Sequence, residues 1–146
     1  METRRIRLSI ESSCQHVPLI SIAVNRLCLL APFSEKDAHA IELCVTEAVV
    51  NSIKHAYGDE PAYEVTISVA IESDRIIIDV CDTGSPMAPG LLEEKKETAS
   101  AFCLESIDAI PESGRGLAII QGFMDDVSYR MESRRNCIRM VKIIST

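Results

Sequence analysis

The sequence lacks three features that are typical of nucleic-acid-binding, membrane-spanning and secreted proteins. It has no long block of lysine and arginine and a formal net charge of −7, whereas binding to a phosphate backbone needs a basic surface. Its most apolar window, "LISIAVNRLCLLAPF", is interrupted by Asn25 and Arg26 and is too short to span a bilayer. The first residues, "METRRIRLSIESS", contain no apolar segment of a signal peptide. We therefore expect a cytoplasmic protein that contacts neither a membrane nor nucleic acid directly.

The spacing of the cysteines argues against both a metal site and a disulfide framework. The six cysteines are spread over the chain, and no two of them form a C-x-x-C pair. Four of them lie in apolar contexts, namely "RLCLL", "ELCVT", "DVCDT" and "AFCLE". We expect reduced, packed thiols and no zinc site, because ligand pairs at local spacing are missing.

The order of predicted elements indicates a single domain over residues 1–146 with an α+β fold. A chain of 146 residues can bury one core but is too short for two domains. Residue periodicity predicts strands at 5–10, 63–71, 75–82, 127–131 and 136–144, and helices at 17–31, 34–58 and 116–126. Ser34 is the expected N-cap of the second helix, and Gly58 is expected to end it. Such an order favours a two-layer sandwich with helices on one face of a sheet.

A long connection of weak periodicity separates the third strand from the last helix. Residues 83–113 contain three prolines, Pro86, Pro89 and Pro111. Connections of this length inside a compact domain are usually functional lids or disordered segments.

The second predicted helix carries a narrow polar strip beside its apolar stripe. The apolar stripe is expected to face the core and comprises Ile41, Cys44, Val45, Ala48 and Ser52. Glu47, Asn51 and Lys54 follow one another along one flank, with His55 beside them. A glutamate and an asparagine one turn apart can together hold a hydrated Mg²⁺ ion or an attacking hydroxyl. A partly exposed helix flank is the alternative, and His55 is equally well explained as a helix-end residue.

Two further short motifs are compatible with ligand binding, each with a simpler explanation. Asp82 ends a buried strand, where a carboxylate needs a donor, and the exocyclic amine of a base is one candidate. Its alternative role is to cap a turn in "DTGS". In "GRGLAII", two glycines open a helix, where free backbone N–H groups and the helix dipole favour an anion. The alternative is a loop that happens to precede a helix.

Taken together and in this order, the motifs resemble the Bergerat-type ATP-binding domain shared by gyrase and histidine kinases. The closer resemblance is to the anti-sigma-factor serine kinases. It is carried by "VTEAVVNSIKHAYGDE" (45–60), "VCDTGSPM" (80–87) and "GRGLAIIQGFMDDVSY" (114–129). The resemblance covers nearly the whole chain. It implies a mixed, mainly antiparallel sheet covered on one face by three helices, with an ATP lid at about 86–113.

The resemblance also assigns expected roles to individual residues. Glu47 would be the general base that deprotonates a protein serine or threonine, and Asn51 would ligate Mg²⁺. Asp82 would accept a hydrogen bond from the adenine amino group, and Gly84 would line the ring. Lys54 and His55 are candidates for the phosphate side of the site. The glycine box would border the phosphates of ATP and comprises Gly114, Arg115, Gly116 and Leu117.

One departure from the family pattern affects the adenine site. Family members usually carry Gly-Thr-Thr or a similar small triplet at the start of the last strand, and one threonine there commonly supports the adenine. This chain has Arg135, Asn136 and Cys137 instead, which puts that support in doubt.

The resemblance implies an ATP- and Mg²⁺-dependent serine/threonine protein kinase that acts as an anti-sigma factor. Such a kinase phosphorylates an anti-sigma-factor antagonist, sequesters a sigma factor in a partner-switching cycle, and forms a homodimer. The alternative is a nucleotide-gated binding module that switches partners without kinase activity. The presence of both Glu47 and Asn51 favours the enzyme. A histidine-kinase catalytic domain is less favoured, since such domains follow a helical hairpin and this sequence starts at its first strand.

Overall fold

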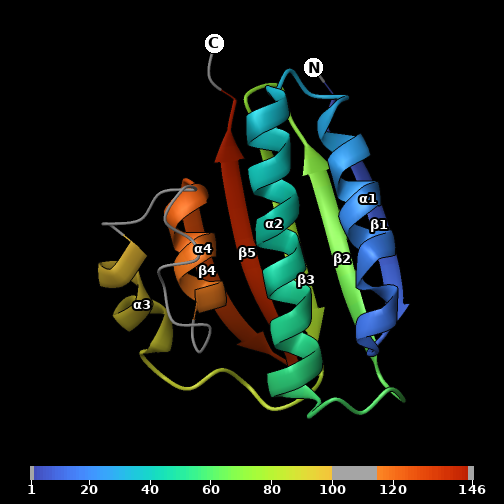
Figure 1. The fold of residues 1–146 in the computed structure, drawn as a ribbon, viewed down its shortest axis with the longest axis vertical. Coiled ribbons are helices and arrows are strands. Elements are labelled where there is room, and N and C mark those ends of the chain that lie inside the picture. The colour runs from blue at the N-terminus through green and yellow to red at the C-terminus, as the bar shows by residue number, and fades with distance from the viewer. Residues whose placement is uncertain (1, 100–114, 145–146) are drawn as a thin grey trace.

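A computed structural model describes residues 2–99 and 115–144, which form an α+β two-layer sandwich (Figure 1). The strands are β1 (Arg4–Glu11), β2 (Glu64–Ile71), β3 (Arg75–Asp82), β4 (Asp126–Glu132) and β5 (Arg135–Ile143). The helices are α1 (Val17–Cys28), α2 (Glu35–Asn51), α3 (Leu91–Ala99) and α4 (Arg115–Phe123). A 3₁₀ turn, η1 (Cys14–His16), precedes α1, and a π-helical turn, η2 (Ser52–Ala56), continues α2.

The five described strands form one sheet in the order β1-β2-β3-β5-β4. Every pairing between them is antiparallel, so the expectation of a mixed sheet is corrected for this part of the chain. The connections explain the difference. The chain reverses direction three times between β1 and β2, namely before α1, between α1 and α2, and after α2, so β2 runs antiparallel to β1 (Figure 1). β4 runs in the same direction as β3, but β5 lies between them and pairs with both.

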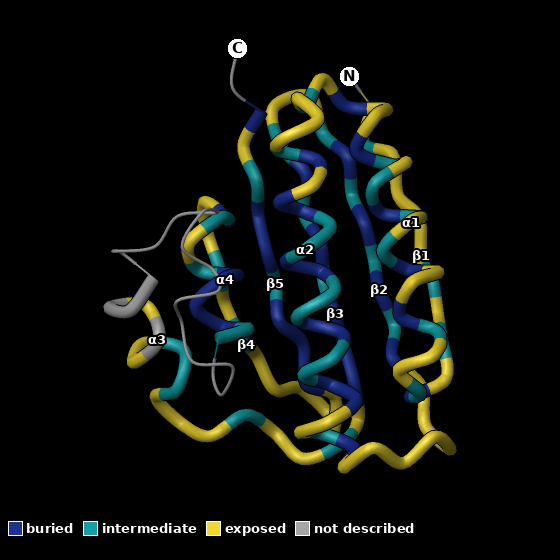
Figure 2. The backbone as a smooth tube through the Cα atoms, in the orientation of Figure 1, coloured by how far each residue is buried: buried dark blue, intermediate teal, exposed yellow. Residues whose placement is uncertain are grey.

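Three helices, α1, α2 and α4, cover one face of the sheet, as predicted (Figure 1). The core lies between the two layers, where the inner sides of the helices and the central strands are buried (Figure 2). In β2 every second residue is buried, as expected for a strand with one covered face. The predicted apolar stripe of the second helix is confirmed, because all five of its members are buried: Ile41, Cys44, Val45, Ala48 and Ser52.

The start of α2 agrees with the predicted N-cap. The Ser34 hydroxyl accepts a hydrogen bond from the Asp37 N–H at 3.1 Å and thus caps α2, as predicted.

α3 forms within the long connection, where the sequence predicts no helix. Leu91 and Leu92 pack against the core as two adjacent residues, which gives no helical periodicity. The Gln121 side chain of α4 donates to the Leu92 carbonyl at 3.1 Å. Among the described residues, no helix combines the length and apolar character needed to cross a membrane.

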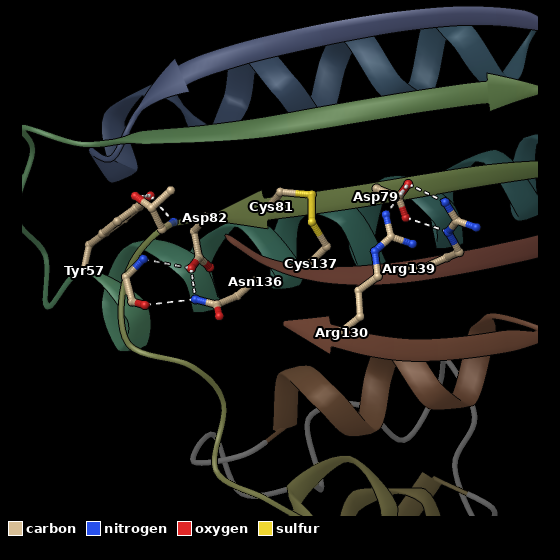
Figure 3. The surroundings of a disulfide bond; sticks show 10 residues. Tyr57, Asp79, Cys81, Asp82, Arg130, Asn136, Cys137 and Arg139 are labelled. Atoms are coloured by element: carbon tan, nitrogen blue, oxygen red, sulfur yellow. Dashed lines mark hydrogen bonds and ion pairs between the residues drawn. A yellow bond between two sulfur atoms is a disulfide. The ribbon is translucent and has the colours of Figure 1, made fainter. Parts of the chain in front are cut away.

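The expectation that all the cysteines are reduced is wrong for two of them. Cys81 and Cys137 form a disulfide between β3 and β5 (Figure 3). They lie directly opposite each other in the strand register, although they are 56 residues apart in the sequence. Cys28 and Cys44 are free and buried, and burial raises the pKa of each thiol to about 12. These two fit the expected packed thiols, and Cys103 lies outside the described residues.

The disulfide predicts a measurable dependence of stability on reductant. Its loss frees a long loop in the unfolded state, which should lower the free energy of unfolding by about 2–5 kcal/mol. Urea unfolding with and without dithiothreitol should show this drop in the parent protein. A protein with both Cys81→Ser and Cys137→Ser should be less stable and indifferent to the reductant. Equal numbers of reactive thiols in the denatured parent before and after reduction would contradict the pairing.

Candidate active site

A cavity of about 890 Å³ lies between four parts of the fold: α2 with η2, the start of α4, the C-terminal end of β3 and the start of β5. It brings together the three sequence motifs, which are far apart along the chain. The predicted site residues that line it are Glu47, Asn51, Lys54, His55, Asp82, Arg115, Gly116 and Leu117. Gly84 is absent from the described lining, and Gly114 lies outside the described residues.

Glu47 and Asn51 project into the cavity from successive turns of α2. Burial raises the pKa of the Glu47 carboxyl, while the charges of Arg115 and Lys54 partly oppose this shift. A carboxylate with a raised pKa and two cations nearby is suited to accept a proton. The π-helical turn starts directly after Asn51, and Lys54 and His55 still reach the same cavity from it.

Gly116 lies so close to this pair that a side chain in its place would push the ends of Glu47 and Asn51 aside. An ideal Cβ built at Gly116 would lie 2.9 Å from Glu47 Oε2 and 3.3 Å from Asn51 Nδ2. The glycine therefore lets the first turn of α4 approach the polar strip of α2. The first N–H groups of an α-helix have no partner within the helix, and Gly116 and Leu117 of this first turn line the same cavity as the carboxylate and the amide.

Asp82 is fixed at the other end of the cavity by two donors. The carboxylate is buried, and its Oδ1 accepts hydrogen bonds from the Gly84 N–H at 3.1 Å and from Asn136 Nδ2 at 2.9 Å (Figure 3). Asn136 lies directly opposite Asp82 in the register of β3 and β5 and also donates to the Gly84 carbonyl at 2.9 Å. This role of Asn136 cannot be read from local sequence patterns, because it depends on which strand pairs with β3.

Gly84 is held against η2. An ideal Cβ at Gly84 would lie 2.2 Å from the Ala56 carbonyl oxygen, and the Ser85 N–H donates to that same oxygen at 2.9 Å. The close approach of two backbones thus requires glycine here, whether or not a ring lies beside it. The role of Gly84 beside a base stays a prediction.

Tyr57 ties the end of η2 to two strands. Its hydroxyl donates to the Glu64 carbonyl at 2.7 Å and accepts from the Thr83 N–H at 2.8 Å. Its ring stacks on Tyr63 with 4.9 Å between the ring centroids. These contacts fix η2 next to the end of β3 and hence keep the cavity wall in place.

The predicted lid is described only up to residue 99. Its first part is tied to β4 by the Met87 N–H, which donates to the Tyr129 hydroxyl at 2.8 Å. Met87 and Leu91 then line the cavity before α3 packs beside α4. Residues 100–113 of the predicted lid lie outside the described residues.

The oxygen atoms in the cavity suit a Mg²⁺ ion that takes most of its coordination from waters and from bound phosphates. Glu47 Oε2 lies 2.9 Å from the ideal Cβ position of Gly116, and the Asn51 amide lies beside it, with Nδ2 at 3.3 Å and Oδ1 at 3.5 Å. A carboxylate oxygen and an amide oxygen are therefore close together. Among the described residues, no group of three or more His, Cys, Asp or Glu could hold a metal by itself. Mg²⁺ usually keeps several waters and binds through one or two protein oxygens plus phosphates, which fits this donor set.

Comparison with known families agrees with the geometry of the cavity. The model of the histidine kinase-like ATPase domain matches residues 10–142. The chain belongs to this family. The expected Bergerat-type fold is thus confirmed.

Several relatives of this chain carry the name serine-protein kinase RsbW. The protein from Oceanobacillus iheyensis is 28% identical over 122 residues, which cover 84% of this chain and 76% of that protein. The protein from Listeria monocytogenes is 28% identical over 124 residues, which cover 84% of this chain and 77% of that protein. A chain in the crystal structure of the SiaB-SiaC complex from Pseudomonas aeruginosa has the same fold, with a TM-score of 0.58 and 12% identity. That match covers 95% of this chain and 88% of the other.

Alanine in place of Gly84 or of Gly116 is expected to have different effects on stability. Gly84→Ala places a methyl group against the fixed Ala56 backbone and should lower the free energy of unfolding by roughly 1–3 kcal/mol. Gly116→Ala meets only side-chain ends, which can move, and should leave stability nearly unchanged while it displaces Glu47 and Asn51. Urea unfolding of both variants measures the difference. An equal loss of stability in the two would contradict the distinct environments of these glycines.

Proposed function

We propose that this domain is an ATP-dependent serine/threonine protein kinase of the partner-switching type. In this proposal it phosphorylates an anti-sigma-factor antagonist and sequesters a sigma factor when the antagonist is not available. The observation that carries the proposal is the convergence of Glu47, Asn51 and Gly116 in one cavity whose far end holds Asp82. The similarity to proteins named serine-protein kinase supports the same reaction.

The cavity offers a suitable contact for each part of a nucleotide. Asp82 would accept from the adenine amino group, and the backbone at Gly116 and Leu117 would donate to the phosphates. Arg115 and Lys54 would offset negative charge near Glu47, since both lower the pKa of that carboxyl. Asn51 would hold Mg²⁺ through its amide oxygen, and the bound Mg-ATP would supply the phosphoryl group together with charge neutralisation.

Glu47 would serve as the base in the transfer step. A protein hydroxyl oxygen forms the new bond to the γ-phosphorus while the bond to the β,γ-bridging oxygen breaks, and ADP leaves with that electron pair. The hydroxyl proton passes to Glu47. Partial burial favours this transfer, because it raises the pKa of the carboxyl.

The wider biological setting is part of the proposal and comes from the resemblance. It includes a homodimer, a cytoplasmic location and exchange between an antagonist and a sigma factor. None of these elements is needed for the chemistry at Glu47. Capture of the partners and phosphotransfer can therefore be measured separately on the same protein.

Replacement of Glu47 tests the proposed reaction. Glu47→Gln should keep ATP binding but lower phosphotransfer to the antagonist by roughly 10²–10⁴-fold, the usual contribution of a positioned base. Glu42→Gln is a matched control, since Glu42 lies on another flank of α2 and accepts from Asn25. The measurement is a time course with radiolabelled ATP, run beside a pull-down of the partner. Parental transfer rates in Glu47→Gln would overturn the mechanism, and partner capture without any transfer by the parent would favour the non-enzymatic binding module.

The pKa of Glu47 predicts how rate and stability depend on pH. Only the ionised carboxylate can accept the proton, so the acid limb of the rate profile should lie above the ordinary glutamate value of about 4.3. The folded state binds the Glu47 proton more tightly than the unfolded state does. This contribution to stability is therefore full below the unfolded pKa and is lost as pH rises through the folded pKa. At neutral pH, Glu47→Gln should be at least as stable as the parent in urea unfolding, and a clear loss of stability would contradict the raised pKa.

A further inference from the structure

Asp82 and Asn136 form a hydrogen-bonded pair in the wall of the cavity. Within the described part of the chain, both donors to Asp82 fall on Oδ1, namely the Gly84 N–H and Asn136 Nδ2. The amide nitrogen of Asn136 also donates to the Gly84 carbonyl. Its two hydrogens are therefore both used, at 2.9 Å each.

These partners fix the orientation of the Asn136 amide. Asp82 Oδ1 and the Gly84 carbonyl oxygen are both acceptors here, so the group that faces them must be the NH₂. The amide oxygen consequently lies on the other side of the side chain, away from Asp82 Oδ1 (Figure 3).

Two acceptor oxygens are left for a ligand. Among the described residues, no protein donor meets Asp82 Oδ2 or Asn136 Oδ1, yet no described side chain has a fully buried polar atom without a partner. Each of these two oxygens therefore keeps accessible surface, although the residues are 9% and 6% exposed. Both residues line the cavity.

We infer that Asn136 is a specificity-determining residue which, together with Asp82, reads the two hydrogens of a 6-amino group on a purine. The inference rests on the proposed function, in which the base lies at Asp82, and it adds a second reader of that base. An exocyclic amine carries two hydrogens, and the pair offers one acceptor for each. A 6-oxo group would instead meet two acceptors with its lone pairs.

The disulfide keeps the two readers in register. Cys81 and Cys137 form the cross-strand pair next to the pair of Asp82 and Asn136, at the end of the β3·β5 ladder. The pair is thus held close to a covalent clamp (Figure 3). Rigid acceptors discriminate between bases better than mobile ones, because they do not rearrange around the wrong group.

Nucleotide analogues test the inference on the unaltered chain. Calorimetric titration should give the highest affinity for ATP, and inosine triphosphate should bind roughly ten- to a hundredfold more weakly. N6-methyl-ATP is the decisive probe, because it keeps one hydrogen on the amine. A single acceptor at Asp82 would accept this analogue as well as ATP, with the methyl group turned away. With two acceptors, the methyl group meets Asn136 Oδ1, and affinity should fall by about tenfold.

A variant locates the second acceptor. Asn136→Leu has a similar volume but offers no acceptor, so the difference between ATP and N6-methyl-ATP should largely disappear. A purely structural role of Asn136 would weaken both nucleotides equally and leave their ratio unchanged. Asn25→Leu makes the same chemical change at an amide that bonds Glu42 between α1 and α2 and does not line the cavity, and it should keep the parental ratio.

The outcomes separate this inference from the proposed function. Equal affinities of the parent for ATP and N6-methyl-ATP, or an unchanged ratio in Asn136→Leu, would overturn the inference while ATP binding stands. Absence of ATP binding by the parent would overturn the proposed function and the inference with it. If Asn136→Leu does not fold, Asn136→Ser and the analogue series on the parent decide the same question.

Discussion

The pairing of the ends of β3 and β5 is the constraint on which the rest of the site depends. It places Asn136 opposite Asp82 and closes the cavity at that end. The Cys81–Cys137 disulfide links the same two strands. Two pairs further from Asp82 in the ladder, Arg139 forms a bidentate ion pair with Asp79, at 2.8 and 2.9 Å. Loss of this register would separate the Asp82 carboxylate from its donor Asn136, because all three cross-strand pairs share it.

The opposite end of the cavity is built by helices and is organised by one close contact. Gly116 lets α4 approach Glu47 and Asn51, and the π-helical turn after Asn51 carries Lys54 and His55 to the same space. Tyr57 then fixes this turn against β2 and the end of β3. The two ends of the site are thus linked through the contacts of the Tyr57 hydroxyl with backbone groups of Glu64 and Thr83.

The sequence predicts those parts of the fold that rest on local signals. The cap at Ser34 and the apolar stripe of α2 follow from spacing within one element, and both are confirmed. The disulfide and the Asn136 contact depend on which residues meet across strands some 55 positions apart, which no local pattern encodes. The sequence does not predict α3, because its partly buried residues Leu91 and Leu92 are adjacent and form no helical stripe. Similarity to a family located the motif residues, but a departure such as Asn136 could be interpreted only once its neighbours were known.

The cavity combines a destabilising group with a rigid frame. Burial disfavours the charged form of Glu47, so this carboxylate weakens the fold at neutral pH, as the direction of its pKa shift requires. The cost is tolerated because α2 buries its core stripe and every second residue of β3 is buried beneath the helices. Glu47 costs stability, lies near the positive charges of Arg115 and Lys54, and faces Gly116, which has no side chain. A chemical role toward a ligand best explains this combination. The rigid ladder at Asp82 and the reactive strip at Glu47 would then divide the work, with one end selecting the base and the other acting on the phosphates.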